Sequence, residues 1–363
     1  MPEWRCIGCG GPLQNTSPDA PFYTPKSYQE GVPIYCERCY KIRHYGQIKP
    51  SFVSERVLAE TLTLVESRPG ILLWTVDALD FYGSMHPDLI ALAAHKRTLL
   101  IVNKIDVLPK SLSREKLRQA YLTMAHDAGV SVEDLVLVSA LKKTDIDTLI
   151  ERTRLLSKGQ DVTLVGVSNV GKSSVLNAML GAQQLMKNPI TTSFEANITQ
   201  GLIPFRLKDY TLYDTPGLRA KHAYRHYLSG DSLRRIMPFK EIKPTVFQTV
   251  SHRSFFLGGL AYLSFTDEPT GHIATYVANT LLVHARLDEN PEAFYDAKVG
   301  HLLNPPATTD PSVPLKRTTF ELKGAAISVF FPGLGFVRVW GAHAVQVATY
   351  EPIEPILHPG VIG

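Results

Sequence analysis

The sequence lacks any apolar run that approaches the ~20 residues of a membrane-spanning helix. Its first residues, MPEWRCIGCGG, contain neither the basic nor the apolar segment of a secretory signal, so we expect a cytoplasmic protein. Low-complexity tracts are also absent, and 44% of the 363 residues are hydrophobic, which excludes a wholly disordered chain. The formal net charge of +4 is too small to indicate a partner by itself. A chain of this length predicts two or three domains.

Cysteine is scarce and is confined to the first 40 residues. The four cysteines form two C-x-x-C pairs, Cys6 with Cys9 and Cys36 with Cys39. Two such pairs can place four thiolates around one ion, a set that favours zinc, although iron fits the same geometry. Disulfides are the alternative, and a reducing compartment disfavours them. We predict a zinc-binding module over residues 1–48 that is folded largely by its metal.

Basic and aromatic residues alternate around the second cysteine pair, in the segment CERCYKIRHYGQIK. This mixture is typical of surfaces that contact phosphates and bases. It is equally typical of a solvated basic rim, and the pattern does not decide between the two.

Residues 49–220 alternate helical patterns with short apolar runs, among them ILLWTVDA, TLLIVNKID, LVLVSA and DVTLVGV. Such runs suit strands that are buried on both faces of a sheet. The alternation predicts an α/β domain with a mostly parallel sheet. Ligands of these domains bind at the carboxyl ends of the strands, and the polar motifs of this region fall at those ends.

The strongest motif is G-x-x-x-x-G-K-S, formed by Gly166, Gly171, Lys172 and Ser173 between a predicted strand and a predicted helix. Its glycines let backbone N–H groups wrap a phosphate chain, as in P-loop proteins. Lys172 can reach the β- and γ-phosphates, and Ser173 can bind Mg²⁺. The sequence therefore predicts a nucleoside triphosphate site.

A second phosphate motif, Asp214-Thr-Pro-Gly217, ends another predicted strand. We expect Asp214 to hold Mg²⁺ through water and the Gly217 N–H to meet the γ-phosphate. Between the two motifs, Thr191 or Thr192 can close over Mg²⁺ and the γ-phosphate when triphosphate is bound, and we favour Thr192. Adjacent threonines are also ordinary loop residues.

A third motif, Asn103-Lys104-Ile-Asp106, follows the run TLLIV and indicates guanine recognition. The Asp106 carboxylate can accept hydrogen bonds from N1–H and the 2-amino group of guanine, which adenine does not offer. Asn103 is expected to brace the phosphate loop and the Lys104 stem to cover the ring. Ser139-Ala140 can present a backbone N–H to the guanine oxygen.

These motifs define a predicted site. The residues expected to act in hydrolysis are Lys172, Ser173, Thr192, Asp214 and Gly217. The residues expected to contact the nucleotide are Asn103, Lys104, Asp106, Ser139, Ala140, Gly166, Asn169, Val170, Gly171, Lys172, Ser173, Ser174, Thr191, Thr192 and Asp214. The expected magnesium ligands are Ser173, Thr192 and Asp214.

The order of the motifs is unusual, because the guanine motif precedes the phosphate loop. In the usual GTP-binding domain the phosphate loop comes first. The same site forms if the chain is circularly permuted, with the old ends joined near residues 155–160 and new ends after Asp214–Gly217.

The zinc knuckles, the permuted motifs and the C-terminal extension together resemble the YqeH family of circularly permuted GTPases over the whole chain. The segment from Val76 to Ser84 also resembles a signature of that family. The resemblance implies a GTPase that assists assembly of the small ribosomal subunit, with GTP or GDP, Mg²⁺ and Zn²⁺ as cofactors. It implies small-subunit rRNA or ribosomal proteins as partners, and a C-terminal domain similar to an RNA-binding β fold. We expect a monomer that binds no membrane.

Two positions bear on the rate of hydrolysis. Leu218 follows Gly217 where many GTPases place a water-orienting glutamine, and an aliphatic side chain cannot polarise water, so we expect slow intrinsic hydrolysis. Asn169 occupies a loop position that helps to bind potassium in GTPases that resemble this one. A potassium ion there can stabilise developing charge; alternatively Asn169 only shapes the loop.

Residues 221–363 are predicted to form an α+β or mostly β domain that contacts RNA or protein, because alternating runs such as FVRVW and AVQVATY indicate antiparallel strands. The stretch from Arg219 to Lys243 holds seven Lys or Arg against two acids, and we expect it to touch RNA, with a solvated surface as the alternative. The scattered histidines of this domain are expected to be packing or surface residues.

Three functions fit the sequence. The first is a GTP-driven switch on a ribonucleoprotein particle. The second is a P-loop kinase, which the guanine motif disfavours because a kinase has no need to select guanine. The third is a guanine-nucleotide-gated scaffold with little hydrolysis, which Leu218 makes a serious alternative.

Overall fold

The structure is a computed structural model that describes residues 4–6, 12–16, 22–25, 34–37, 40, 55–182, 202–250, 252–265, 271–287, 289–307 and 315–359. The chain divides into two compact units. The first consists of residues 1–77, 85–104 and 125–219, and the second of residues 78–84, 105–124 and 220–363. Two short segments of the predicted α/β region thus belong to the second unit, and the domain boundaries at 48 and 220 stay a prediction.

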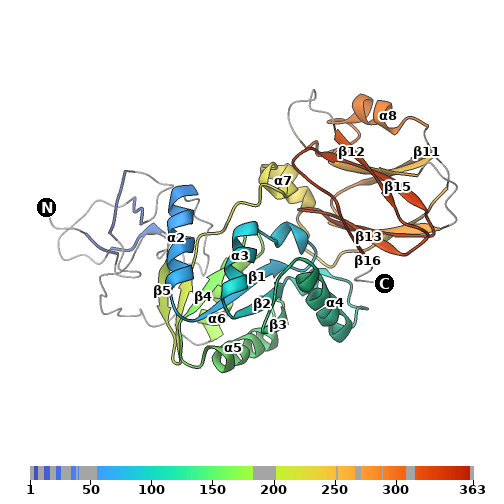
Figure 1. The fold of residues 1–363 in the computed structure, drawn as a ribbon. Coiled ribbons are helices and arrows are strands. Elements are labelled where there is room, and N and C mark those ends of the chain that lie inside the picture. Colours follow the sequence, from blue (N-terminus) through green and yellow to red (C-terminus); the bar gives the residue numbers. More distant parts are fainter. Residues whose placement is uncertain are drawn as a thin grey trace. The chain divides into compact units, whose positions relative to one another are not determined.

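A six-stranded sheet forms the centre of the first unit (Figure 1). Its strands are β1 (Ile71–Asp77), β2 (Thr98–Asn103), β3 (Asp134–Val138), β4 (Val162–Val165), β5 (Ile203–Arg206) and β6 (Thr211–Asp214). They lie in the order β3-β2-β1-β4-β6-β5, and every pair is parallel except β5 with β6. All residues of β1, β2 and β4 are buried. The predicted α/β fold with a mostly parallel sheet is confirmed.

Helices α5 (Lys143–Ser157) and α6 (Lys172–Ala182) cover one face of this sheet, because their apolar residues share a buried cluster with β1 to β4 and β6. Helix α2 (Glu55–Ser67) packs against α3 (Pro87–His95). The sequence analysis missed α3, although Pro87 opens its first turn and the His86 ring accepts a hydrogen bond from the Asp88 N–H. Helix α4 (Arg114–Asp127) spans the division between the units.

The second unit is built from two five-stranded antiparallel sheets, in the orders β16-β13-β14-β10-β7 and β11-β8-β9-β15-β12. Their strands are β7 (Thr245–Gln248), β8 (Arg253–Leu257), β9 (Ala261–Ser264), β10 (His272–Val277), β11 (Val283–Leu287), β12 (Leu315–Glu321), β13 (Ile327–Phe331), β14 (Gly335–Trp340), β15 (Ala344–Tyr350) and β16 (Ile356–Pro359). Two short helices, α7 (Gly230–Ile236) and α8 (Pro291–Lys298), accompany them. The predicted mostly β C-terminal region is confirmed.

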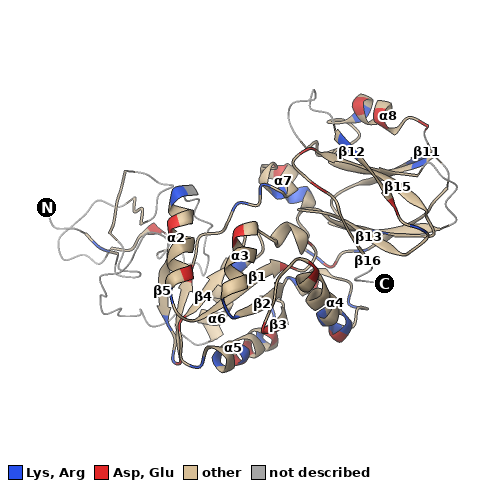
Figure 2. Ribbon diagram, in the orientation of Figure 1, with Lys and Arg blue, Asp and Glu red and all other residues tan. Residues whose placement is uncertain are grey.

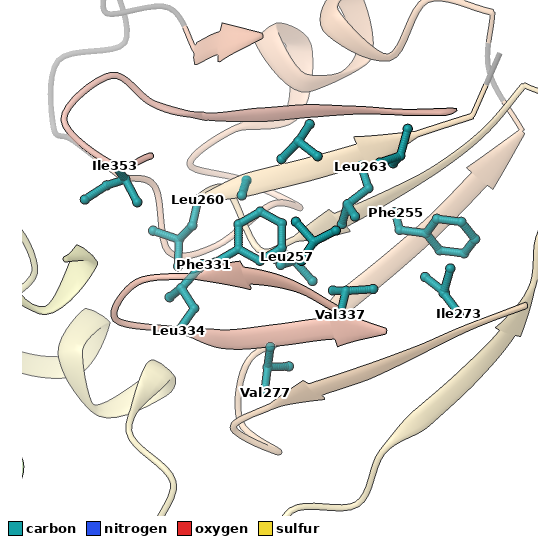
Figure 3. Close-up of a cluster of buried hydrophobic side chains, with 14 of the residues drawn as sticks. Phe255, Leu257, Leu260, Leu263, Ile273, Val277, Phe331, Leu334, Val337 and Ile353 are labelled. Carbon is teal, nitrogen blue, oxygen red and sulfur yellow. The ribbon is translucent and has the colours of Figure 1, made fainter. Parts of the chain in front are cut away.

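The two sheets enclose the core of the second unit (Figure 3). Phe255 and Leu263 enter it from one sheet, and Ile273, Phe331 and Val337 enter it from the other. Alternate residues of each strand face this core, which is the period-two pattern that predicted these strands. The residues between them face outward.

Asp80 anchors residues 78–84 within the second unit. Its buried carboxylate accepts hydrogen bonds from the N–H groups of Gly83, at 3.1 Å, and Gly333, at 2.7 Å, and lies 3.6 Å from the Arg225 guanidinium. Gly333 has a φ of +93°, and a Cβ there would lie 2.5 Å from the Tyr224 nitrogen, so only glycine fits. The family-like segment after β1 is therefore bonded to the segment that follows the second phosphate motif.

Tyr224 ties that second segment to the core of the sandwich. Its ring is fully buried, and its hydroxyl donates to the Leu260 carbonyl at 2.7 Å and accepts from the Tyr350 N–H at 3.2 Å. Burial raises the pKa of the Tyr224 hydroxyl above its ordinary value, so the group remains a neutral donor.

Among the described helices, none combines the length and apolar character that a bilayer crossing requires.

Replacing Tyr224 by phenylalanine removes both hydrogen bonds, so the buried Leu260 carbonyl and the half-buried Tyr350 N–H lose this partner. We expect Tyr224→Phe to lower the free energy of unfolding by about 1–3 kcal/mol in denaturant titrations. Tyr227→Phe is the matched control, since it removes only an exposed bond to the Lys221 carbonyl and should cost less than about 0.5 kcal/mol. Equal losses in the two variants would contradict this assignment.

Candidate nucleotide-binding site

The predicted motifs all follow strands at one edge of the sheet in the first unit. β4 leads into the phosphate loop, β2 into Asn103 and Lys104, β6 into Asp214, and β3 into Ser139. These strands are parallel neighbours together with β1, so their carboxyl ends meet at the same edge. Motifs that are permuted along the chain are therefore adjacent in space.

The phosphate loop depends on backbone conformations that favour glycine. Gly166 and Gly171 have φ values of +158° and +88°, and Asn169 has a φ of +70°. A Cβ on Gly166 would lie 2.8 Å from the Thr75 carbonyl oxygen, and one on Gly171 would lie 2.3 Å from the Asn103 amide nitrogen. The glycines thus allow the close approach of β1 and of the guanine motif to the loop.

Asn103 joins the phosphate loop to the loop after β3. Its buried side chain donates from Nδ2 to the Val170 carbonyl at 3.0 Å, and its Oδ1 accepts the Ala140 N–H at 3.2 Å. The predicted bracing role agrees with these contacts. We expected a backbone N–H of Ser139-Ala140 to meet the guanine oxygen, and the Ala140 N–H is bonded to Asn103 in this arrangement. Ser139 donates its N–H to the Asp145 carboxylate at 3.0 Å.

Lys104 connects the guanine motif to the phosphate loop by charge. Its Nζ lies 2.7 Å from the Asp77 carboxylate and donates to the Asn169 carbonyl at 2.5 Å. Its φ of +64° is uncommon for a residue other than glycine and is typical of functional sites. Asp77 was not among the predicted site residues, although a carboxylate at the end of a fully buried strand needs a cationic partner. That rule was the signal that could have identified it.

Asp106 lies in a single 3₁₀ turn, Ile105–Val107, that directly follows Lys104, and its side chain is exposed. Its contact with guanine stays a proposal.

Lys172 and Asp214 bring the two phosphate motifs together. Both side chains are buried, and the Lys172 ammonium contacts the Asp214 carboxylate and the Thr215 carbonyl. Thr215 in turn donates its hydroxyl to the Leu164 carbonyl at 2.9 Å. Lys172 begins α6, where half-buried Ser173 and exposed Ser174 also lie in the first turn. Lysine, serine and carboxylate groups therefore share one small region.

Leu218 is paired with the phosphate loop through its backbone. Its N–H donates to the Gly166 carbonyl at 3.1 Å, and its carbonyl accepts from the Ser168 N–H at 2.8 Å. The Leu218 side chain is fully buried, and Gly217 lies against Ser168. The residue after the second phosphate motif thus offers no polar group to a water molecule. Thr191 and Thr192 lie outside the described residues.

Cys6 and Cys36, one from each C-x-x-C pair, lie together and are buried, and the Cys36 N–H is 3.1 Å from the Cys6 sulfur. Cys9 and Cys39 lie outside the described residues. Within the described part of the chain, no three histidine, cysteine or acidic side chains form a metal-binding group. One cysteine from each pair of the predicted module therefore lies in the same buried cluster.

Two family models match the chain. Residues 161–245 match the model described as "50S ribosome-binding GTPase", and residues 271–356 match the model described as "YqeH-like, C-terminal". The first match covers both phosphate motifs, and the second covers most strands of the sandwich.

Curated proteins from several organisms are similar to the chain. "Uncharacterized protein YqeH" of Bacillus subtilis (strain 168) is 32% identical over 97% of this chain and 97% of its own length. "NO-associated protein 1, chloroplastic/mitochondrial" of Arabidopsis thaliana is 25% identical over 83% of this chain and 62% of its own length. "GTPase Der" of Aquifex aeolicus (strain VF5) is 32% identical over 39% of this chain and 33% of its own length.

Asn103→Ala should weaken GTP binding without unfolding the protein, because the Val170 carbonyl and the Ala140 N–H lose their partner. We expect about a 10- to 100-fold loss of affinity, corresponding to about 1–3 kcal/mol, measured by calorimetry. Asn279→Ala is the control, since Asn279 also bridges two backbone groups but does so at the exposed surface of the second unit. Unchanged affinity in Asn103→Ala would contradict the bracing role.

Proposed function

Because the chain belongs to the YqeH family, we propose that it is a GTP-driven switch that assists assembly of the small ribosomal subunit. The observation that carries the proposal is the convergence of two motifs that are reversed along the chain. Asn103 and Lys104 of the guanine motif both bond to the backbone of the phosphate loop. One nucleotide can therefore meet both motifs, with its base at one and its phosphates at the other.

Guanine selectivity is assigned to Asp106. An ionised carboxylate accepts two hydrogen bonds from guanine, whereas adenine would leave the charge unpaired. The Lys104 ammonium is held by Asp77 and by the Asn169 carbonyl, and we assign its stem to cover the guanine ring. A kinase function gains nothing from this arrangement.

The residues at the phosphate end fit a magnesium–triphosphate complex. Asp214 and Ser173 supply oxygen ligands of the kind that Mg²⁺ prefers, and we assign Thr192 as a third. The ion would neutralise phosphate charge, while Lys172 would contact the β- and γ-phosphates and the Gly217 N–H the γ-phosphate. We also assign the Asn169 side chain to a potassium ion.

Slow intrinsic hydrolysis follows from Leu218, because its buried aliphatic side chain cannot orient water. The same observation keeps a second function open, a nucleotide-gated scaffold that binds a partner and hydrolyses little GTP. The two functions differ in single-turnover hydrolysis, which a ribosomal particle or K⁺ accelerates only in the first.

The cysteines support a zinc module at the start of the chain. Cys6 and Cys36 already lie together, and thiolates in two C-x-x-C pairs form the tetrahedral set that zinc favours. Cys9 and Cys39 would complete the set. A buried apolar cluster with Ile203 of β5 adjoins the two cysteines.

We expect one zinc ion per chain by mass spectrometry of the native protein and of total metal. Cys36→Ser should lower that content and expose the first 50 residues to limited proteolysis, since metal binding folds such modules. A full chain without zinc or iron, yet equally resistant to protease, would exclude the module.

The ribosomal partner is assigned from family membership. The cytoplasm stays the location that we expect from the sequence, although curated relatives include proteins named as chloroplastic or mitochondrial. The description of one matched family model names the large (50S) ribosomal subunit, so the binding experiment below includes both subunits. Helix α7, which carries Arg234 and Arg235 in its last turn, supports an RNA contact in the basic stretch from Arg219 to Lys243 (Figure 2).

With a non-hydrolysable GTP analogue bound, the protein should co-sediment with small subunits and less with large ones, and GDP should weaken the association. Reversing the charges of Arg234 and Arg235 should weaken it and reduce its salt dependence. Charge reversal at Lys142 and Lys143, exposed at the start of α5, is the control. Association with large subunits alone, or with neither, would refute the assigned partner.

A further inference from the structure

The outward face of one sheet in the second unit carries two stacked rings. Ile273 and Val339 face the core, so their neighbours His272 and Trp340 face outward. His272 on β10 lies directly opposite Trp340 on β14, with ring centroids 4.5 Å apart and ring planes at 20°. The two rings therefore form one preassembled aromatic surface.

Polar and cationic groups surround these rings. Arg338, two residues before Trp340 on the same face, places its guanidinium 5.0 Å from the indole centroid. Gln248 on the edge strand β7 is the register neighbour of His272, and both are exposed. The outward positions of β7, β10 and β14, all of them described, contain no acidic residue. The surface thus combines a flat ring face, a cation and an amide.

The backbone under this surface is closely held. The Thr249 N–H donates to the Gly271 carbonyl at 3.0 Å, and the Gly271 N–H donates back to the Thr249 hydroxyl at 3.2 Å. Arg253 donates to the Gln248 carbonyl at 3.2 Å. A Cβ on Gly271 would lie 1.8 Å from the Trp340 carbonyl oxygen, so β10 and β14 approach closely there. A fixed platform loses little conformational entropy when a ligand binds.

The opposite sheet offers a matched arrangement with a structural role. There the Arg286 guanidinium lies 4.3 Å from the Phe294 ring centroid, and His284 stacks on the same ring at 5.6 Å. Phe294 is buried, however, in a cluster with Phe256 and Tyr295. Arginine and histidine complete a small core at that place. Trp340 is half-exposed and belongs to no described core cluster, so its stack is not explained by packing.

We propose that His272, Trp340 and Arg338 form a stacking site for the bases of single-stranded RNA. The inference rests on the proposed ribosomal function and specifies which surface of the second unit meets RNA. Bases stack on aromatic side chains when their faces are free, as in single strands and loops but not in a duplex. Arg338 contributes positive charge beside the stack, and the Gln248 amide can bond to base edges. An acidic peptide could pair with the Arg338 guanidinium, but it would not stack on the rings of His272 and Trp340.

Asp267 and Glu268 precede β10 in the sequence and lie outside the described residues. Two acids lie close to the site in sequence, and Arg338 is the cation beside the two rings. We therefore expect stacking of the bases, rather than charge, to contribute most of the RNA affinity. The contribution of this site to the salt dependence of RNA affinity should accordingly equal that of about one phosphate contact.

The test measures binding of fluorescent ten-nucleotide oligouridine and oligoadenosine, and of an RNA hairpin duplex, to the full chain by anisotropy. His272→Ala and Trp340→Ala should each weaken single-strand binding about 5- to 100-fold. The controls His284→Ala and Arg286→Ala should change it less than about twofold. Arg338→Ala should also reduce the slope of log affinity against log salt by about one, and His272→Ala should not.

Quenching of tryptophan fluorescence by bound RNA provides a second readout, which distinguishes a loss of RNA binding from a loss of folding. Of the three tryptophans, Trp74 is fully buried, and Trp4 is half-buried in the first unit. The quenching that Trp340→Phe removes is therefore the part that comes from Trp340. Trp340→Phe keeps an aromatic ring; it should retain most of the RNA affinity but lose most of the quenching. Loss of affinity in Trp340→Ala with retention in Trp340→Phe supports stacking rather than global unfolding.

Three results would overturn the inference: wild-type protein that does not bind single strands, a duplex bound as tightly as single strands, or target variants that match their controls. Normal GTP binding and normal association with small subunits in the same variants would then leave the proposed function standing. Loss of subunit association in the wild type would instead refute the proposed function itself.

Discussion

The contacts between the guanine motif and the phosphate loop are the constraint on which the first unit depends. Asn103 bonds to Val170, and Lys104 bonds to Asn169 while pairing with Asp77. Buried amide and charged groups are stable only when their partners are placed correctly, so these bonds specify the relative position of three strand ends. Chain order is irrelevant to that requirement, which is why a permuted sequence can build the same site.

The division of the chain gives this site a second property. The chain passes from the first unit to the second after Asp77, after Lys104 and after Arg219. Each passage follows the carboxyl end of a strand, or the motif after it, where the nucleotide is proposed to bind. Within the second unit, Asp80 and Arg225 join the segments that begin at the first and third passages. The nucleotide motifs are therefore continuous in sequence with segments of the second unit at three points.

Sequence patterns predicted the strands and turns that depend on residues close together in the chain. Apolar runs identified β1, β2, β3 and β4, and the glycines of the phosphate loop identified a turn that their φ values confirm. Helix α3 was missed because it is short and follows an irregular segment. The edge strand β5 was missed as well, since it has only four residues, of which one is buried.

Pairings between distant residues were less accessible to sequence analysis. The Asp80–Arg225 contact and the Asp77–Lys104 pair join residues whose distance in sequence carries no periodic signal. His272 was expected to be a packing or surface residue, and only the strand register places it on Trp340. The zinc module rests mainly on the spacing of the four cysteines in the sequence. Cys6 and Cys36 are the two of them that the structure describes, and they lie together.

The most direct test of the account is the nucleotide preference of Asp106→Asn compared with the wild type. Asparagine replaces one acceptor by a donor, which matches the 2-oxo group of xanthine and not the 2-amino group of guanine. We predict that the wild type binds GTP far more tightly than ATP or xanthosine triphosphate, and that the variant prefers xanthosine triphosphate. A wild type from which ATP displaces GTP equally well, or a variant with unchanged GTP affinity, would contradict the convergence of the motifs on one guanine nucleotide.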